Sequence, residues 1–241
     1  MKTFFCTLTI ASAALALSSC ATSRLEYIDA TIAPAMAQPG SVAIAGMVAK
    51  NENCLPEERE QDIILNRLAI KLGQKRKHLR ITGHDAFERE VGPTRRIGSG
   101  YTGSLTFALS PGQVEKAKHL QERFALVISL SENNTWCDVD ESCDTREEHI
   151  YDEHGHVIDC RTWTEYTTSS CSHRAVRAEY LLYDLSTGRK VWACSSQYEE
   201  SRSQSSCSTH CYPPPPPHPA PPATSDVMEN MAAAAIRKYP K

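Results

Sequence analysis

The sequence predicts an α+β fold in which a mixed β-sheet is flanked by helices, and three observations indicate it. Residues 41–50 (SVAIAGMVAK) and 124–130 (FALVISL) are apolar at nearly every position, as in strands that are covered on both faces. A helical pattern after residue 56 lies between the first of these strands and a short strand at 79–82, so the chain begins as a β-α-β unit. An alternating hairpin and a final helix then close the predicted domain, which spans residues 41–239.

The helix after Pro56 has the strongest helical pattern in the chain. Proline suits the first helical position, and acidic residues follow it at once, while basic residues crowd positions 71–77. Ile64, Leu68 and Leu72 recur at i, i+4 and i+8, which places them on one buried face. We therefore expect this helix to cover the sheet between its first two strands.

The middle of the chain predicts a strand, a helix and a second covered strand. Residues 101–109 alternate between apolar and small polar side chains, which favours a half-buried strand. Ser110 and Gln113 have the spacing of a capping box, so a helix is expected from there to about Arg123. Residues 98–103 match G-x-G-x-x-G, but charged residues precede them and a strand is expected to follow, so we reject a dinucleotide site.

The last third of the chain predicts a hairpin and a terminal helix. Residues 176–182 alternate, residues 184–188 (DLSTG) form a turn, and residues 191–198 return as the partner strand. The helix begins with Ser225 as its N-cap and carries an apolar stripe that we expect to pack on the sheet. Residues 213–222 are mostly proline, so we expect them to be extended and to act as a stiff spacer for this helix.

The first twenty residues resemble a bacterial lipoprotein signal. Lys2 precedes an apolar run of about fourteen residues, which is too short to span a bilayer, and Leu17-Ser18-Ser19-Cys20 resembles a lipobox. The resemblance implies cleavage after residue 19 and a diacylglyceryl group on Cys20. We expect a signal peptide at 1–19 and a lipidated tether at 20–40. Ala21 after the cysteine favours the outer membrane, with the domain on its periplasmic or surface face.

The charge of the mature chain excludes one class of partner. Removal of residues 1–19 leaves 25 basic and 29 acidic residues, a net charge of −4. This balance offers no electrostatic footprint for nucleic acid and no polybasic patch for anionic lipid. We therefore expect a lipid anchor and an envelope protein partner, and no nucleic acid.

Eight cysteines remain beyond the signal, and an even set in an exported chain predicts disulfides. The candidates are Cys54, Cys137, Cys143, Cys160, Cys171, Cys194, Cys207 and Cys211. Most of them lie in or near an acidic insertion at 133–159 and a Ser/Pro-rich segment at 201–223. The sequence thus predicts a disulfide-rich insertion, with the pairing left open.

A metal site is the alternative use of the same residue types, because thiolate and imidazole ligands suit zinc or copper. The sharpest local cluster consists of Cys207, His210, Cys211 and His218. A second candidate set joins the histidines at 149, 154 and 156 to the acids around them. We find no nucleophile elbow, no C-x-x-C pair and no distinguishable acid pair, so we expect no enzyme activity and no cofactor.

The order of elements resembles a group of outer-membrane lipoproteins that includes the curli-secretion lipoprotein and the lipoprotein activator of penicillin-binding proteins. The resemblance is carried by residues 41–50 and 124–130, by the YDLSTGRKVW hairpin at 183–192 and by the alanine-rich final helix. It implies a non-catalytic periplasmic adaptor or pore subunit. The favoured function is a non-catalytic envelope adaptor, assembly or binding module, and the alternative is a metal-binding lipoprotein.

Overall fold

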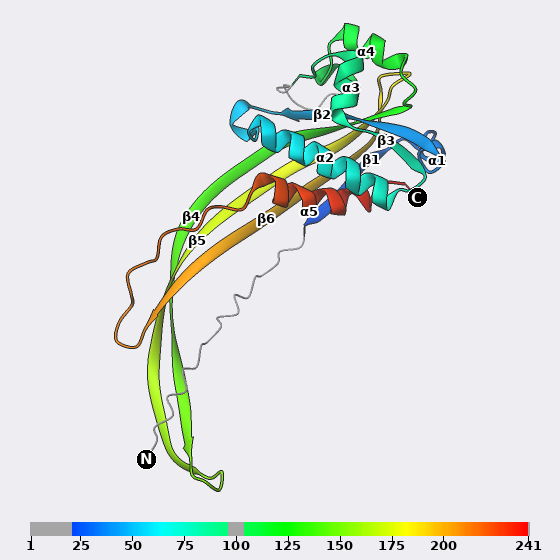
Figure 1. The fold of residues 1–241 in the computed structure, drawn as a ribbon. Coiled ribbons are helices and arrows are strands. Elements are labelled where there is room, and N and C mark those ends of the chain that lie inside the picture. Colours follow the sequence, from blue (N-terminus) through cyan, green and yellow to red (C-terminus); the bar gives the residue numbers. More distant parts are fainter. Residues whose placement is uncertain (1–20, 96–103, 241) are drawn as a thin grey trace.

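A computed structural model describes residues 21–95 and 104–240, and its centre is one six-stranded sheet (Figure 1). The predicted signal peptide, Cys20 and the glycine-rich motif at 98–103 lie outside the described residues. In sheet order the strands are β1 (Thr22–Ile28), β6 (Lys190–Ser208), β5 (Val157–Asp184), β4 (Phe124–Tyr151), β2 (Gly40–Ala49) and β3 (Leu79–Thr82).

The sheet is mixed, as the sequence predicts. Strand β2 runs parallel to both β3 and β4, whereas β4, β5, β6 and β1 pair antiparallel in turn. Helix α2 (Glu58–Lys75) connects β2 to β3, which confirms the β-α-β start. The predicted hairpin is the junction of β5 and β6, where Gly188 adopts a positive φ of 66° in the turn.

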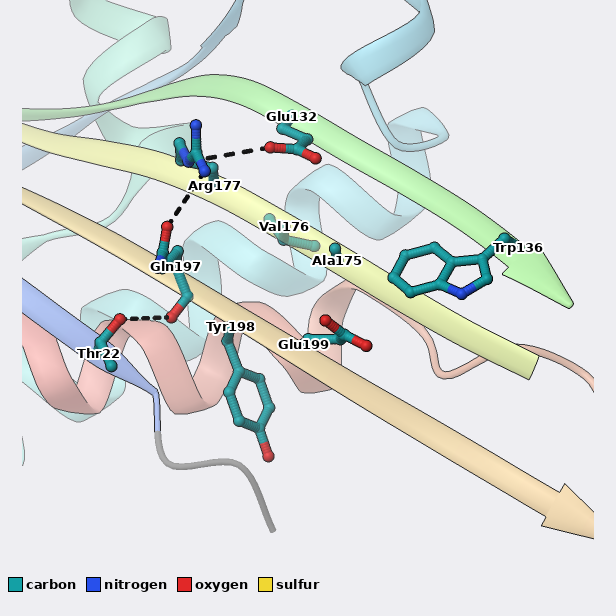
Figure 2. A pocket seen from close by; sticks show the side chains of 9 residues that line it. All are labelled: Thr22, Glu132, Trp136, Ala175, Val176, Arg177, Gln197, Tyr198 and Glu199. Atoms are coloured by element: carbon teal, nitrogen blue, oxygen red, sulfur yellow. Dashed lines mark hydrogen bonds and ion pairs between the residues drawn. The ribbon is translucent and has the colours of Figure 1, made fainter. Parts of the chain in front are cut away.

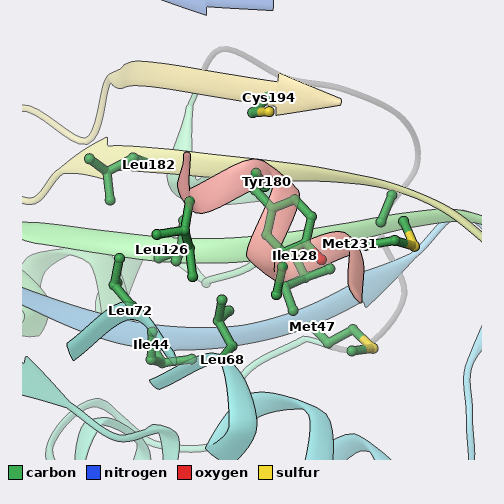
Figure 3. Packing of buried hydrophobic residues seen from close by; sticks show 14 of the residues in the cluster. Ile44, Met47, Leu68, Leu72, Leu126, Ile128, Tyr180, Leu182, Cys194 and Met231 are labelled. Atoms are coloured by element: carbon green, nitrogen blue, oxygen red, sulfur yellow. The ribbon is translucent and has the colours of Figure 1, made fainter. Parts of the chain in front are cut away.

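Helices cover both faces of the sheet and bury two apolar clusters. Helices α2 and α5 (Thr224–Ile236) pack on one face, where Leu68, Tyr180 and Met231 meet in the larger cluster (Figure 3). The second cluster lies on the other face, under α3 (His84–Val91), α4 (Pro111–Lys118) and the 3-10 turn η2 (Leu105–Phe107). Two further short elements lie in the described part of the chain, α1 (Ala33–Met36) and the 3-10 turn η1 (Glu52–Cys54).

The terminal helix packs against the sheet and α2, as predicted. Its apolar residues Val227, Met228 and Met231 are at most 1 % exposed. At the rim, Arg67 Nη1 of α2 lies 2.9 Å from Asp226 Oδ1, and Lys71 Nζ donates to Glu229 Oε1 at 2.6 Å. Among the described residues, no helix is both long enough and apolar enough to cross a bilayer.

Several segments differ from the sequence prediction. Helix α4 ends at Lys118 and not near Arg123, and the N-cap of α5 is Ala223 and not Ser225. Residues 22–28 were expected in the tether, but they form β1 along the edge of β6. Their side chains are almost all exposed, so backbone pairing holds them and no apolar pattern marks the strand. Residues 105–107 form η2 and not a strand, although Leu105, Phe107 and Leu109 are buried as the alternation indicated.

Three strands continue beyond this body as a long curved arm (Figure 1). The pairing of β2 with β4 ends at Leu130, and the pairing of β1 with β6 starts at Gln197. We call residues 131–177 and 198–208, which lie beyond these points, the arm. The predicted insertion at 133–159 therefore consists of the arm part of β4, the turn and the first residues of β5, and it is regular β-structure apart from its turn.

The end of the arm is thinner than its base. The pairing of β5 with β6 stops at Tyr166 and Ser208, so residues 144–165, which we call the tip, form only two strands. Side chains of the tip are almost all exposed. The turn at its end is closed by the Asp152 amide, which donates to the His156 carbonyl at 2.8 Å.

The proline-rich segment lies along one face of the arm. Thr168 Oγ1 donates to the Pro213 carbonyl at 2.8 Å, and Ser170 Oγ donates to the Pro216 carbonyl at 2.6 Å. Near the body, Arg174 Nε donates to the Pro222 carbonyl at 2.5 Å. Because the segment covers them, Thr168 and Ser170 are fully buried although they are polar.

Candidate functional site

The two faces of the arm differ, and the difference defines the candidate site. On β5 the residues at 168, 170 and 172 are buried on the side that the proline-rich segment covers. The alternate residues at 171, 173 and 175 point the other way and are partly exposed, because side chains alternate across a strand. We call this second side the open face.

His173 lies at the centre of the open face. It stands opposite Trp136 of β4 in the ladder, and the two rings stack with centroids 4.9 Å apart and planes 3° from parallel. Its Nε2 lies 3.1 Å from Asp138 Oδ1, and its Nδ1 lies 3.6 Å from Glu199 Oε1 of β6. With its side chain only 17 % exposed, the imidazole is held from three sides by neighbouring strands.

Cys171 completes a group of three possible metal ligands with His173 and Asp138. One ligand atom from each of these side chains lies within 4.8 Å of the others. Burial raises the pKa of the Cys171 thiol, and the nearby charges of Asp138 and Asp140 raise it further. The free thiol is therefore protonated at neutral pH, so it is not an activated nucleophile. Cysteine, histidine and aspartate are residue types that bind metal ions.

A shallow hollow of about 440 Å³ borders this group at the base of the arm (Figure 2). Arg177 crosses it, with Nη2 donating to Gln197 Oε1 at 3.2 Å and Nε 3.9 Å from Glu132 Oε2. Trp136 and Glu199 line the hollow and also contact His173, so hollow and ligand group form one continuous surface. The remaining lining residues are Thr22, Ala175, Val176 and Tyr198.

A second ligand group lies on the tip. His149 stands opposite Cys160, and Cys160 Sγ donates to Glu147 Oε1 at 2.8 Å. The three side chains are all exposed. The structure thus joins His149 to a thiol and a carboxylate, and not to His154 and His156 as the sequence suggested. Because its side chains are exposed, this group offers less support to a bound ligand than the group around His173 does.

The predicted disulfides are not found. All eight cysteines from Cys54 to Cys211 are free in the described part of the chain. The register explains the result, because the residues opposite the cysteines in β4, β5 and β6 are not cysteines. Those opposite residues include Ser172, Tyr166, His149, Asp138, Tyr180 and Thr167. Cys137 and Cys171 come closest along the ladder, but they lie one register step apart and so point to opposite faces.

The predicted quartet of Cys207, His210, Cys211 and His218 is not brought together either. All four lie in the described part of the chain, yet no three of them have ligand atoms within 4.8 Å of one another. Cys207 stands opposite Thr167, whereas His218 Nδ1 lies 3.2 Å from the Cys171 carbonyl. These places are four residues apart along β5, or about 13 Å. The proline-rich segment carries His218 past the other three.

Sequence reasoning missed His173, Trp136 and Glu199 as members of a site. Each comes from a different strand, and they meet only because β4, β5 and β6 pair in one register. The available signal is the period-two pattern of β5, in which Cys171 and His173 share a face. The sequence shows this pattern, but it does not show which residues lie opposite on the neighbouring strands.

The chain shows only weak similarity to known proteins. No family model and no curated protein sequence matches the chain. The structure is similar to the PelC dodecamer from Paraburkholderia phytofirmans at 12 % identity and a TM-score of 0.42, over 91 % of this chain and 97 % of that one. It is also similar to lipoprotein GNA1162 from Neisseria meningitidis at 14 % identity and a TM-score of 0.36, over 72 % and 87 %. Likenesses at this level say nothing about function.

Proposed function

We propose that this chain is a lipid-anchored, non-catalytic envelope protein that binds a protein partner along its arm. The observation that carries the proposal is the free outer edge of β4. The η1 turn contacts this edge at Ser131 and Asn133, and among the described residues no strand pairs with β4 on its outer side from residue 134 to residue 151. That edge is roughly 60 Å of extended chain at about 3.3 Å per residue. Unpaired backbone groups along such an edge can accept an added strand.

The charge of the arm indicates the chemistry of the partner. Residues 133–159 contain nine acids and a single base, Arg146, for a net charge of −8. Like charges oppose the pairing of two copies of this edge, and they attract a basic segment. We therefore propose a basic, extended segment of another envelope protein as the partner.

The lipobox at residues 17–20 supports the anchor in this proposal. A diacylglyceryl group on Cys20 would hold the protein stably on a membrane, because two acyl chains suffice for stable anchoring. Metabolic labelling with a palmitate analogue tests this part. We expect label in the wild type and none in a Cys20→Ala variant; an unlabelled wild type would remove the anchor from the proposal.

Site-specific photo-crosslinking in intact cells tests the arm. We place the crosslinker at Val139 or Ile158, which are 44 % and 63 % exposed on the arm, and at Ile70, which is 61 % exposed on α2 of the body. We expect the same basic partner to be crosslinked from both arm positions and not from Ile70. Equal products from all three positions, or none from the arm, would contradict the proposal.

A shortened arm provides the matched variant. Replacing residues 144–165 by Asn-Gly joins Cys143 to Tyr166, which stand opposite each other, by a two-residue hairpin turn. The variant keeps the body, the three-stranded part of the arm and the group around His173. We expect it to fold and to lose most of the crosslinking at Val139, because seven acids and two bases are removed.

A further inference from the structure

We propose that Asp138, Cys171 and His173 form a zinc site on the open face of the arm. Their ligand atoms already lie within 4.8 Å of one another, and His173 Nε2 lies 3.1 Å from Asp138 Oδ1. In a tetrahedral zinc site, ligand atoms lie about 3.4 Å apart, as the usual zinc–ligand bond lengths require. We infer that side-chain rotations of Cys171 and Asp138 close the site.

The types of ligand select the metal class. A thiolate, an imidazole and a carboxylate together suit zinc among the common cellular cations, whereas calcium and magnesium require oxygen ligands. Three protein ligands leave the fourth position to water or to a group of the partner. None of the four ligands predicted from the sequence between residues 207 and 218 belongs to this site.

The surroundings of His173 are those of a supported ligand. If Nε2 binds the metal, Nδ1 carries the proton and faces Glu199 Oε1 at 3.6 Å, which is the carboxylate–histidine–metal arrangement. Nδ1 is buried and makes no hydrogen bond in the structure, so a small approach of Glu199 would satisfy it. The stacked Trp136 fixes the plane of the ring. The imidazole is thus oriented before any metal arrives.

Cys171 stays available as a ligand because of its place in the ladder. Its neighbours on the two flanking strands are Asp138 and Ser203, so in the described part of the chain no cysteine stands opposite it. Zinc binds the thiolate form of cysteine, so the thiol gives up its proton to solvent when the sulfur–zinc bond forms.

Cobalt titration of the reduced full-length protein tests the site, because a cobalt–thiolate bond gives a near-ultraviolet charge-transfer band that zinc then removes. We expect one equivalent of Co²⁺ to produce the band in the wild type and in Cys160→Ser, which removes the exposed thiol of the tip. We expect no band in Cys171→Ser. A band that persists in Cys171→Ser, or its absence from the wild type, would overturn the proposal.

Two further variants, which we expect to disturb folding less than Cys171→Ser, complete the test. Asp138→Asn keeps the shape of a half-exposed side chain and removes its charge, so zinc affinity measured by competition should fall at least about tenfold. Glu199→Gln touches no metal, and we expect about a 10- to 100-fold loss if it supports His173. Unchanged zinc affinity in both variants would exclude the arrangement. None of these changes shortens the arm, so partner crosslinking can be scored separately.

Discussion

Gly46 shows how a single residue couples β2 to the layer that covers it. Its φ is 135°, and the register of β2 against β4 shifts between Ile44 and Gly46. A Cβ atom at this position would lie 2.9 Å from Thr94 Oγ1 and 3.1 Å from His84 Cε1. The Thr94 hydroxyl donates to Glu88 Oε1 at 3.0 Å, so moving it aside would weaken that bond.

We expect Gly46→Ala to lower the free energy of unfolding by about 2–4 kcal/mol. Backbone strain at a positive φ contributes about 1–3 kcal/mol, and a weakened hydrogen bond about 1 kcal/mol more. Gly112→Ala is the matched control, since Gly112 lies in α4 with no atom within 4 Å of an added Cβ. It should change stability by less than about 1 kcal/mol. Urea unfolding measures the free energy of unfolding of the two variants. Equal values for Gly46→Ala and Gly112→Ala would refute the argument.

At the scale of single residues, the sequence predicts the role of Gly46 but not that of His173. A glycine inside an apolar strand predicts a close approach to the backbone, and Gly46 has one. Nothing local distinguishes His173 from a solvated histidine, because its ring is held by Trp136, Asp138 and Glu199 from other strands. Predicting that site requires the register of β4 against β5, which a bulge near Leu130 shifts by one residue.

At the scale of elements, helices α2 and α5 meet through apolar faces and a partly exposed ionic rim. Arg67 contacts both Asp226 and Glu229, and Lys71 contacts Glu229. The hydrogen bond from Lys71 holds the pKa of Glu229 below its ordinary value. The stability from this carboxylate is therefore fully present above that ordinary value of 4.5, and it is lost as the pH falls through the lowered pKa of the folded state.

We expect Glu229→Gln to lower the free energy of unfolding by no more than about 1 kcal/mol at pH 7, because the Glu229 side chain is 39 % exposed and water screens the pair. The difference from wild type should shrink when unfolding is measured well below pH 4.5. Glu90→Gln, at an exposed position of α3, is the control for the removal of one surface carboxylate. A difference that grows on acidification would contradict the assignment.

The proline-rich segment illustrates the limit of prediction for an element. Its composition predicts an extended chain, because proline fixes φ and lacks a donor. Its place in the fold depends on donors elsewhere, namely the hydroxyls of Thr168 and Ser170 and the guanidinium of Arg174. In the sequence those residues look like an ordinary exposed strand. The carbonyls of the proline-rich segment accept hydrogen bonds from these side-chain donors, and only the folded structure pairs them.

At the scale of the whole molecule, the contacts thin out steadily from the body to the tip. The body has apolar clusters on both faces of its sheet. The base of the arm has three strands and the proline-rich segment on one face. The tip has two strands with almost no buried side chains. A two-stranded hairpin is marginal by itself in water, so local stability should follow the same gradient.

Hydrogen exchange measures this gradient residue by residue. We expect paired amides of the tip, in residues 144–165, to exchange at least about a thousandfold faster than those of residues 178–183, which open only with global unfolding. Amides of residues 166–177 should lie between these limits, because a third strand and the proline-rich segment support them. The contrary result is that, in the isolated protein, the tip amides are as well protected as those of the body. This result would show that another chain already pairs with β4. The free edge on which the proposed binding depends would then not exist. Protection that appears in β4 only when the partner is added is the result that a strand-accepting arm requires.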